Sequence, residues 1–213
     1  MRRLGVMGGT FDPIHLGHLD VARAAADALA LEEVRLVPSF VPPHRTAPGA
    51  SAYHRFAMVS LAAASHKRFT ASDEEFRRGG PSYTADTLRG LHAAGFAPGE
   101  LFFLTGADAF AEIATWKEYP ALLDLSHFVV CSRPGHEADM VRGLLPELSE
   151  RMVDGREFEA GAAPRVVLLD ADTANVSSSG VRRAIAAGQA IDGMVLPSVA
   201  AHIRKHGLYN ARQ

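Results

Sequence analysis

The sequence has few of the features that direct a chain to an oxidising compartment, a membrane or a nucleic acid. It has one cysteine, Cys131, so no disulfide can form within the chain. Free cysteines are usually buried, and Cys131 ends the apolar run 127–131, so we expect a buried, unreactive thiol. No apolar stretch approaches the roughly 20 residues that span a bilayer. The net charge of −2 gives no general attraction for nucleic acid.

The N-terminal segment does not resemble a signal peptide. Arg2 and Arg3 are followed by only a short apolar run before a glycine-rich segment, whereas a signal peptide needs an apolar region of 7–15 residues. We therefore expect a cytoplasmic protein without membrane or nucleic-acid partners, in which a homo-oligomer is possible. Because the net charge is small, any anionic ligand must be held by a local cluster of positive groups.

Length and composition are those of an ordinary globular protein. The hydrophobic share is 47% and the charged share 22% over 213 residues, close to the average for folded domains. There is no internal repeat, low-complexity tract or long linker. We predict a single domain over residues 1–213, whose last part, from about residue 177 to 213, forms a small helical extension.

Short apolar runs alternate with segments of helical periodicity. Strands are predicted at residues 4–7, 34–37, 69–71, 101–104, 128–131 and 166–169. Helices are predicted at residues 18–29, 52–64, 84–94, 107–113, 140–152 (interrupted by Pro146), 179–187 and 198–206. This alternation is typical of βαβ units, so the fold class expected is α/β, a doubly wound, Rossmann-like parallel sheet.

Parallel sheets of this kind bind ligands beyond the carboxyl ends of their strands. The loops expected to carry the chemistry are therefore those that follow the predicted strands: residues 8–17, 38–51, 105–108, 132–136 and 170–179.

The most distinctive segment, residues 8–18, reads GGTFDPIHLGH and leads from the first predicted strand into the first predicted helix. Gly8 and Gly9 let the backbone approach a ligand closely, and the helix start offers N–H groups and a positive dipole end. His15 and His18 share one face if the helix begins there. The segment predicts an anion site, although it matches neither G-x-G-x-x-G nor the Walker loop.

His15 and His18 are open to two other roles. A zinc site is weakly supported, because two histidines at this spacing have no third ligand nearby in the sequence. Structural histidines are common in folded proteins. The glycine pair, the strand end and the helix start coincide here, which favours ligand binding.

This segment resembles the signature of the adenylyl- and cytidylyltransferase superfamily, whose H-x-G-H element binds the triphosphate of ATP or CTP. Its exact wording resembles the bacterial nicotinate-mononucleotide adenylyltransferases. Five further elements resemble that family in the same order: residues 42–45 (PPHR), 81–84 (PSYT), 106–108 (GAD) with Trp116, 177–182 (SSSGVR) and 207–209 (G-L-Y). The resemblance extends over nearly the whole chain.

The resemblance implies transfer of AMP from ATP to nicotinate mononucleotide, with release of pyrophosphate. It implies that His15, His18 and Arg182 are catalytic. The ATP-binding residues that it implies are Gly8, Gly9, Thr10, Phe11, His15, Gly17, His18, Gly106, Ser177, Ser178 and Arg182. Mg²⁺ is the expected cofactor, bridging the phosphates and therefore needing few protein carboxylates; no metal is expected to bind the protein directly.

Some of these residues also suit structural roles. Ser177 and Ser178 precede a predicted helix, so they could be its N-caps. Arg182 lies one turn into that helix, where the dipole disfavours positive charge; a bound anion would resolve the conflict. The chain departs from the family in having Ser179 where threonine is usual, which keeps a capping hydroxyl, and Gly180, which costs roughly 1 kcal/mol against alanine.

For the acceptor, the resemblance implies binding by His44, Arg45, Tyr83, Thr84, Asp108, Trp116 and Arg133. Residues 44 and 45 could instead form a solvated loop. Trp116, the only tryptophan, is either a core residue or the platform for the pyridine ring. Asp108 could cap the helix that follows it, bind ribose hydroxyls, or both.

Two other functions compete with this one. Pantetheine-phosphate adenylyltransferases share the first motif, but they lack the PSYT turn and the Trp116 element and are shorter. A non-catalytic nucleotide sensor on the same fold would be expected to have lost a histidine of the triphosphate motif. This chain keeps both histidines, which favours an enzyme.

Overall fold

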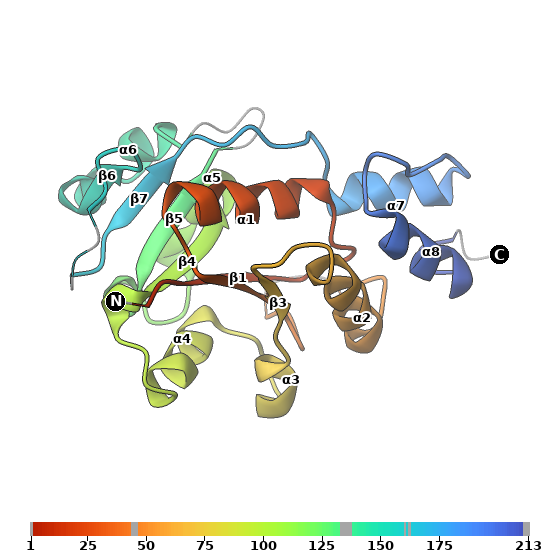
Figure 1. Cartoon of the computed structure of the whole chain (residues 1–213), viewed down its shortest axis with the longest axis horizontal. Coiled ribbons are helices and arrows are strands. Elements are labelled where there is room, and N and C mark those ends of the chain that lie inside the picture. The colour runs from red at the N-terminus through yellow and green to blue at the C-terminus, as the bar shows by residue number, and fades with distance from the viewer. Residues whose placement is uncertain (1, 44–46, 133–137, 160, 162, 211–213) are drawn as a thin grey trace.

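The computed structural model describes residues 2–43, 47–132, 138–159, 161 and 163–210. Seven parallel strands form one sheet in the order β3-β2-β1-β4-β5-β7-β6 (Figure 1). The strands are β1 (Leu4–Gly9), β2 (Glu33–Pro38), β3 (Phe69–Ala71), β4 (Leu101–Gly106), β5 (His127–Cys131), β6 (Met152–Asp154) and β7 (Val166–Leu169). The predicted α/β fold with a parallel sheet is confirmed.

Helices cover both faces of the sheet. The helices are α1 (Leu16–Ala28), α2 (Ala52–Ala63), α3 (Glu74–Arg78), α4 (Thr84–Ala93), α5 (Ala107–Phe110), α6 (Met140–Leu144), α7 (Ser178–Ala186) and α8 (Pro197–Lys205). Helices α1 and α4 lie on opposite sides of the sheet (Figure 1). Side chains of β4 alternate between the two cores: Leu101 and Phe103 face the α4 side, and Phe102 and Leu104 the α1 side. Burial on both faces explains why this strand is a continuous apolar run.

The strand order reverses direction between β1 and β4. Leu4 pairs with Glu33 of β2 on one side and with Leu101 of β4 on the other. The chain runs outward from β1 to β3 and then returns to place β4 at the vacant edge of β1. This is the switch point at which open α/β sheets bind ligands, and the ends of β1 and β4 are Gly9 and Gly106.

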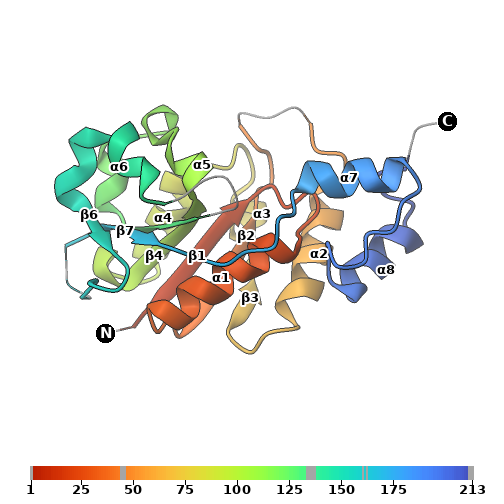
Figure 2. The same cartoon turned by 90° about the horizontal axis from the view of Figure 1, so that it is seen from above.

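The helical C-terminal part lies beside α2 at one end of the molecule (Figure 2). Helix α8 packs against α2, and Val181, Val199 and Ile203 extend the core on the α1 side of the sheet. The Cys131 side chain is buried in β5, as predicted. Among the described residues, no helix is both long and apolar enough to cross a bilayer.

Two predicted helices are wrong in extent. The helix predicted at 140–152 ends at Leu144, because Pro146 lacks an N–H and clashes with the preceding turn; residues Pro146–Arg151 form 3₁₀ turns, and Met152 begins β6. The helix predicted at 107–113 ends at Phe110. The short elements α3 and β6 were not predicted, since three to five residues carry little periodicity.

Candidate active site

The loop between β1 and α1 is shaped by close contacts at its glycines. Phe11 has φ 48, and its buried ring lies so close to Gly9 that a Cβ there would be 3.2 Å from the ring. A Cβ on Gly17 would lie 3.0 Å from the carbonyl oxygen of Ala174 and 3.3 Å from the His15 ring. A side chain at position 9 or 17 would have to displace its neighbours by a few tenths of an ångström, so packing at the two ends of the loop favours glycine there.

His15 and His18 begin α1 as a reciprocal cap. His15 is the N-cap residue, and its backbone N–H donates to Nδ1 of His18 at 3.3 Å. The two ring centroids are 3.7 Å apart, and the Phe11 ring meets His18 edge-on at 5.0 Å. A neutral imidazole whose Nδ1 accepts a hydrogen bond carries its proton on Nε2. His18 thus has the tautomer that donates from Nε2, the role needed against a phosphate oxygen.

The Asp12 carboxylate joins three separate segments of the chain. It is buried and accepts from the backbone N–H groups of Gly49 at 2.8 Å and Ala50 at 3.0 Å, and from the Tyr209 hydroxyl at 2.8 Å. Burial, and after it the adjacent Asp12 charge, raise the pKa of Tyr209. The loop after β1, the segment before α2 and the chain after α8 are therefore held together by one carboxylate.

Helix α7 is attached to the same loop through its first turn. Arg182 donates from Nη1 to the Asp12 carbonyl oxygen at 2.7 Å and lies 3.6 Å from the Asp12 carboxylate. Ser178 donates to the carbonyl oxygen of Pro13 at 2.9 Å. Asp12 thus offsets part of the positive charge at the helix start, so the position of Arg182 does not by itself call for a bound anion. The Arg182 side chain remains 38% exposed.

Ser177 is the N-cap of α7, one of the two roles open to it from the sequence. Its Oγ accepts from the backbone N–H of Gly180 at 3.1 Å. The expectation that Ser179 has the capping role is wrong, because Ser179 lies inside the helix with its hydroxyl 3.1 Å from that of Ser177. Glycine at position 180 suits this cap, because a Cβ there would lie only 3.2 Å from the Ser177 Oγ.

Arg55 holds the backbone of the loop after β1 in place, a role that was not predicted. Its guanidinium is buried and donates to the carbonyl oxygens of Thr10 at 2.7 Å and Phe40 at 3.2 Å. Burial lowers the pKa of Arg55, and the charges of Asp12, Tyr209 and Glu75 oppose that effect. Arg55 thereby fixes the backbone after β1 relative to the backbone after β2.

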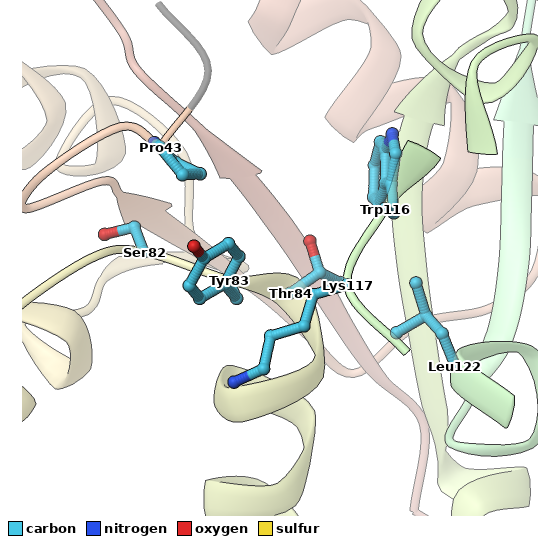
Figure 3. A pocket seen from close by; sticks show the side chains of 7 residues that line it. All are labelled: Pro43, Ser82, Tyr83, Thr84, Trp116, Lys117 and Leu122. Atoms are coloured by element: carbon cyan, nitrogen blue, oxygen red, sulfur yellow. The ribbon is translucent and has the colours of Figure 1, made fainter. Parts of the chain in front are cut away.

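A second part of the site is a cavity of about 130 Å³, partly open to solvent. It is lined by Pro43, Ser82, Tyr83, Thr84, Trp116, Lys117 and Leu122. Trp116 and Leu122 lie on one side of it and Pro43, Ser82 and Tyr83 on the other (Figure 3). Trp116 is half-buried, with its indole edge-on to Phe103 at 5.9 Å. It therefore has a packed edge and also lines the cavity, so it serves the core and remains available to a ligand.

The start of α4 is the polar end of this cavity. Tyr83 is the N-cap residue and Thr84 the first helical residue, so backbone N–H groups and a positive dipole end lie there. The Lys117 ammonium lies 4.8 Å from the Tyr83 ring centre and 2.8 Å from an Asp86 carboxylate oxygen. Lys117 adds positive charge near this helix start and was not predicted as a site residue.

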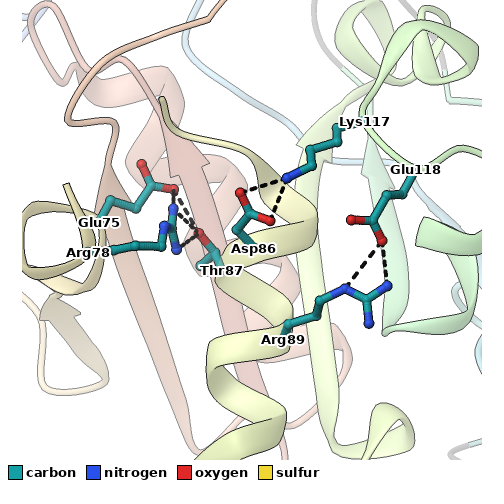
Figure 4. Close-up of polar contacts among 7 residues, drawn as sticks. All are labelled: Glu75, Arg78, Asp86, Thr87, Arg89, Lys117 and Glu118. Carbon is teal, nitrogen blue, oxygen red and sulfur yellow. Dashed lines mark hydrogen bonds and ion pairs between the residues drawn. The ribbon is translucent and has the colours of Figure 1, made fainter. Parts of the chain in front are cut away.

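Ion pairs hold the two walls of the cavity together (Figure 4). Lys117 pairs with Asp86, and Glu118 pairs with Arg89, so the segment that carries Trp116 is joined twice to α4. Exposed pairs of this kind contribute little free energy, about 0–1 kcal/mol each. They mark the contact between the segment that carries Trp116 and α4.

The remaining predicted residues are placed as follows. Gly106 ends β4 and is the N-cap of α5, so Asp108 is not the N-cap as the capping role required; its side chain is exposed in the first turn. Gly8 lies in β1 beside Val37 of β2. Residues His44, Arg45 and Arg133 lie outside the described residues. The ligand contacts expected of all these residues stay predictions.

Removal of the Tyr209 hydroxyl is expected to destabilise the protein. In Tyr209→Phe, Asp12 loses one hydrogen bond to a charged group, and such bonds contribute about 1.5–3 kcal/mol. The free energy of unfolding, measured by urea denaturation, should fall by that amount. Tyr53→Phe, at a side chain that is 74% exposed, is the matched control and should leave it unchanged. Equal values for the two variants would contradict the role given to Tyr209.

The comparisons with known proteins agree with this geometry. A cytidylyltransferase-like family model matches residues 6–184. The chain is 38% identical to a protein of Pseudomonas syringae pv. tomato (99% of this chain, 95% of that protein). It is 41% identical to one of Desulfitobacterium hafniense (98% and 96%). Both relatives carry the name "Probable nicotinate-nucleotide adenylyltransferase".

The chain belongs to the nicotinate-nucleotide adenylyltransferase family. As a member of that family it is a nucleotidyltransferase. The Plasmodium falciparum nicotinic acid mononucleotide adenylyltransferase complexed with NaAD has the same fold, with a TM-score of 0.73, 18% identity and coverage of 98% of both chains. In this chain the loop after β1 lies at the switch point of the sheet.

Proposed function

We propose that this protein transfers the adenylyl group of ATP to nicotinate mononucleotide, giving nicotinic acid adenine dinucleotide and pyrophosphate in NAD biosynthesis. The observation that carries the proposal is the two-part site: a histidine-containing loop at the end of β1, and an aromatic cavity at the start of α4. The relatives' names agree with this reaction.

The β1 loop is proposed to bind the triphosphate of ATP. His18 donates from Nε2, because its Nδ1 accepts from the His15 N–H, and the half-exposed Arg182 offers a planar fork suited to phosphate oxygens. The start of α1 adds its positive dipole end. Asp12 joins the loop to the segments before α2 and after α8, and Arg55 holds the Thr10 carbonyl, so both are proposed as positioning residues.

The cavity is proposed to bind the pyridine ring of the acceptor and its carboxylate. Trp116 offers an aromatic surface, and base–aromatic stacking contributes about 1–3 kcal/mol. The N–H groups at the start of α4, the Thr84 hydroxyl and the Lys117 charge offer donors and positive potential to the carboxylate. One end of the cavity is thus apolar and the other rich in hydrogen-bond donors.

The chemistry needs no nucleophile from the protein. An oxygen of the acceptor 5′-phosphate attacks the α-phosphorus of ATP and forms the new P–O bond. The bond from that phosphorus to the bridging β-oxygen breaks, and pyrophosphate leaves with the electron pair. Catalysis is then positioning and charge neutralisation, and holding two reactants in line supplies up to roughly 7–11 kcal/mol of the barrier.

Mg²⁺ is proposed to bind through the substrate phosphates, where it would neutralise part of their charge. The buried carboxylate of the β1 loop, Asp12, already accepts from Gly49, Ala50 and Tyr209 and lies beside Arg182. Its oxygens are therefore engaged by donors, which fits an ion held by phosphates and not by this carboxylate. The cytoplasmic location and a homo-oligomer stay predictions.

One assay tests the reaction. ATP is mixed with nicotinate mononucleotide, nicotinamide mononucleotide or phosphopantetheine, and pyrophosphate release is measured for each acceptor. The proposal expects the nicotinate substrate to give the fastest release. Faster release with phosphopantetheine would assign the protein to a different acceptor, and no release with any acceptor would favour a nucleotide sensor.

Trp116→Ala is expected to weaken the binding of the acceptor and not that of ATP. Loss of the stacking surface, about 1–3 kcal/mol, should raise the KM for nicotinate mononucleotide about 5- to 150-fold, while the KM for ATP changes little. Trp116→Phe keeps a ring in place and should recover most of the affinity. Equal losses for both substrates, or unfolding of the alanine variant, would show that Trp116 serves only the core.

Arg182→Lys is expected to weaken the interaction with ATP and not that with the acceptor. Lysine keeps the charge but loses the planar fork, and one lost charge-assisted hydrogen bond, about 1.5 kcal/mol, corresponds to a roughly tenfold rise in the KM for ATP or fall in turnover. Arg183→Lys, at the neighbouring position, is the control. A change confined to the KM for the acceptor would place Arg182 on the other substrate.

A further inference from the structure

Three histidines that the reaction does not use meet between α2 and α8. His54 lies in the first turn of α2, and His202 and His206, four residues apart, lie at the end of α8. Nδ1 of His54 is 3.1 Å from Nε2 of His202. One ring nitrogen from each of the three residues lies within 4.8 Å of the other two.

The packing of the two helices brings these rings together. Residues four apart lie on the same face of a helix, so His202 and His206 both face α2, and their ring centroids are 4.4 Å apart. The His54 ring lies 5.3 Å from that of His202 and 4.9 Å from that of His206. His54 and His202 are half-buried and His206 is exposed, so the cluster reaches solvent at His206.

We propose that His54, His202 and His206 form a binding site for a divalent transition-metal ion that favours imidazole ligands, such as Zn²⁺. Zinc–nitrogen bonds of about 2.0–2.1 Å in a tetrahedral arrangement separate the nitrogens by about 3.3 Å. Nδ1 of His54 and Nε2 of His202 are 3.1 Å apart, already close to that separation, and the 4.8 Å limit among the three residues exceeds it by about 1.5 Å. Solvent at the exposed side supplies water as the fourth ligand.

The ligand set also defines which ions the site excludes. Three imidazoles suit Zn²⁺, Cu²⁺, Ni²⁺ and Co²⁺, whereas Mg²⁺ and Ca²⁺ prefer oxygen ligands. The Mg²⁺ that accompanies ATP is therefore not a competitor. In the absence of a transition metal, one imidazole N–H of the His54–His202 pair donates to the other ring, which accounts for the 3.1 Å separation.

A metal at this position would join the C-terminal helix to α2. Helix α8 leads directly into Tyr209, whose hydroxyl donates to Asp12 in the β1 loop. The ion would therefore act as a cross-link that keeps the Tyr209 segment against the loop. The site lies on side chains that have no part in the proposed reaction, so its occupancy can be measured independently of activity.

The test is calorimetric titration of the full chain, without a polyhistidine tag, with Zn²⁺ in the absence of nucleotide. Wild type is expected to bind one equivalent at this site, and Zn²⁺ is expected to raise its melting temperature. His206→Gln and His202→Gln should weaken that equivalent at least tenfold and abolish the rise. Because His206 is exposed, its variant keeps the packing of α8.

Two matched histidine variants locate the ion. His66→Gln, just beyond the far end of α2, and His18→Gln, in the first turn of α1, should both keep the equivalent and the rise in melting temperature. Co²⁺ gives a second readout, a visible ligand-field absorption that His206→Gln should remove. Loss of binding in His18→Gln with retention in His206→Gln would overturn the proposal, as would the absence of Zn²⁺ binding to wild type.

Discussion

The kcat/KM for nicotinate mononucleotide is expected to exceed that for nicotinamide mononucleotide by a large factor, up to about 10⁴–10⁵. The two acceptors differ only in a carboxylate against a carboxamide. The start of α4, with the Thr84 hydroxyl, presents donors to that group. The Lys117 ammonium lies beside the same turn. The position is therefore rich in donors, with the Lys117–Asp86 ion pair beside it.

The discrimination follows from hydrogen-bond pairing. A carboxylate presents acceptors only, so each donor at the helix start finds a partner. The NH₂ of a carboxamide would face those donors and leave polar groups buried and unpaired, at about 1–3 kcal/mol each. Asp86, in the first turn of α4, pairs with Lys117 at 2.8 Å and so is not available to accept from the amide.

The measurement is kcat/KM for both acceptors at saturating ATP. Lys117→Met should reduce the preference for the acid, because it removes the positive charge and keeps the length of the side chain. Lys67→Met, at an exposed position after α2, serves as the control for loss of one surface charge. Equal values for the two acceptors in the wild-type protein, or a preference for the amide, would refute the role given to the start of α4.

His18→Ala is expected to lower turnover by about a hundred- to a thousandfold. Removal of one preorganised donor to developing charge costs about 2.7–4 kcal/mol of transition-state stabilisation in other enzymes. His18 has its Nδ1 engaged by the backbone N–H of His15, which leaves the proton on Nε2. Steady-state kinetics with both substrates saturating measures the effect directly.

A second substitution separates the effect of His18 on turnover from its effect on the stability of the start of α1. His18→Asn keeps an acceptor for the His15 N–H, and with it the start of α1, but removes the imidazole. Its turnover should fall as far as that of His18→Ala, while its free energy of unfolding stays close to that of wild type. Near-normal turnover in either folded variant would remove His18 from the catalytic residues.

The sheet was predictable because its central strands are buried on both faces and so appear as short apolar runs. The run at Leu101–Leu104 is an example, with its side chains divided between the two cores. The segment 140–152 was not predictable in the same way. Its apolar residues fit a helix, but Pro146 ends the helix and Met152 joins an edge strand, a pairing with β7 that local periodicity does not encode.

Part of the site is formed within one segment of the chain, and part by contacts between segments far apart in the sequence. Residues 8–18 were predictable because glycines and histidines of one segment carry the motif. The supports of that segment come from elsewhere: Arg55 contacts Thr10 across 45 residues, and Tyr209 contacts Asp12 across 197 residues. One signal was available, since Arg55 falls on the helical stripe of Met58, Val59 and Ala62 that faces the core. A charged residue on such a stripe indicates a buried polar contact.

The Asp12–Tyr209 hydrogen bond also affects when the β1 loop can reach its final geometry during synthesis of the chain. Its two partners are 197 residues apart, and at roughly 5–20 residues per second a ribosome needs about 10–40 s to make the chain between them. The central strands β1 and β4 are complete well before then. A nascent chain can therefore assemble most of its sheet while the β1 loop still lacks its C-terminal anchor, and the loop acquires its final geometry only once Tyr209 has left the ribosome.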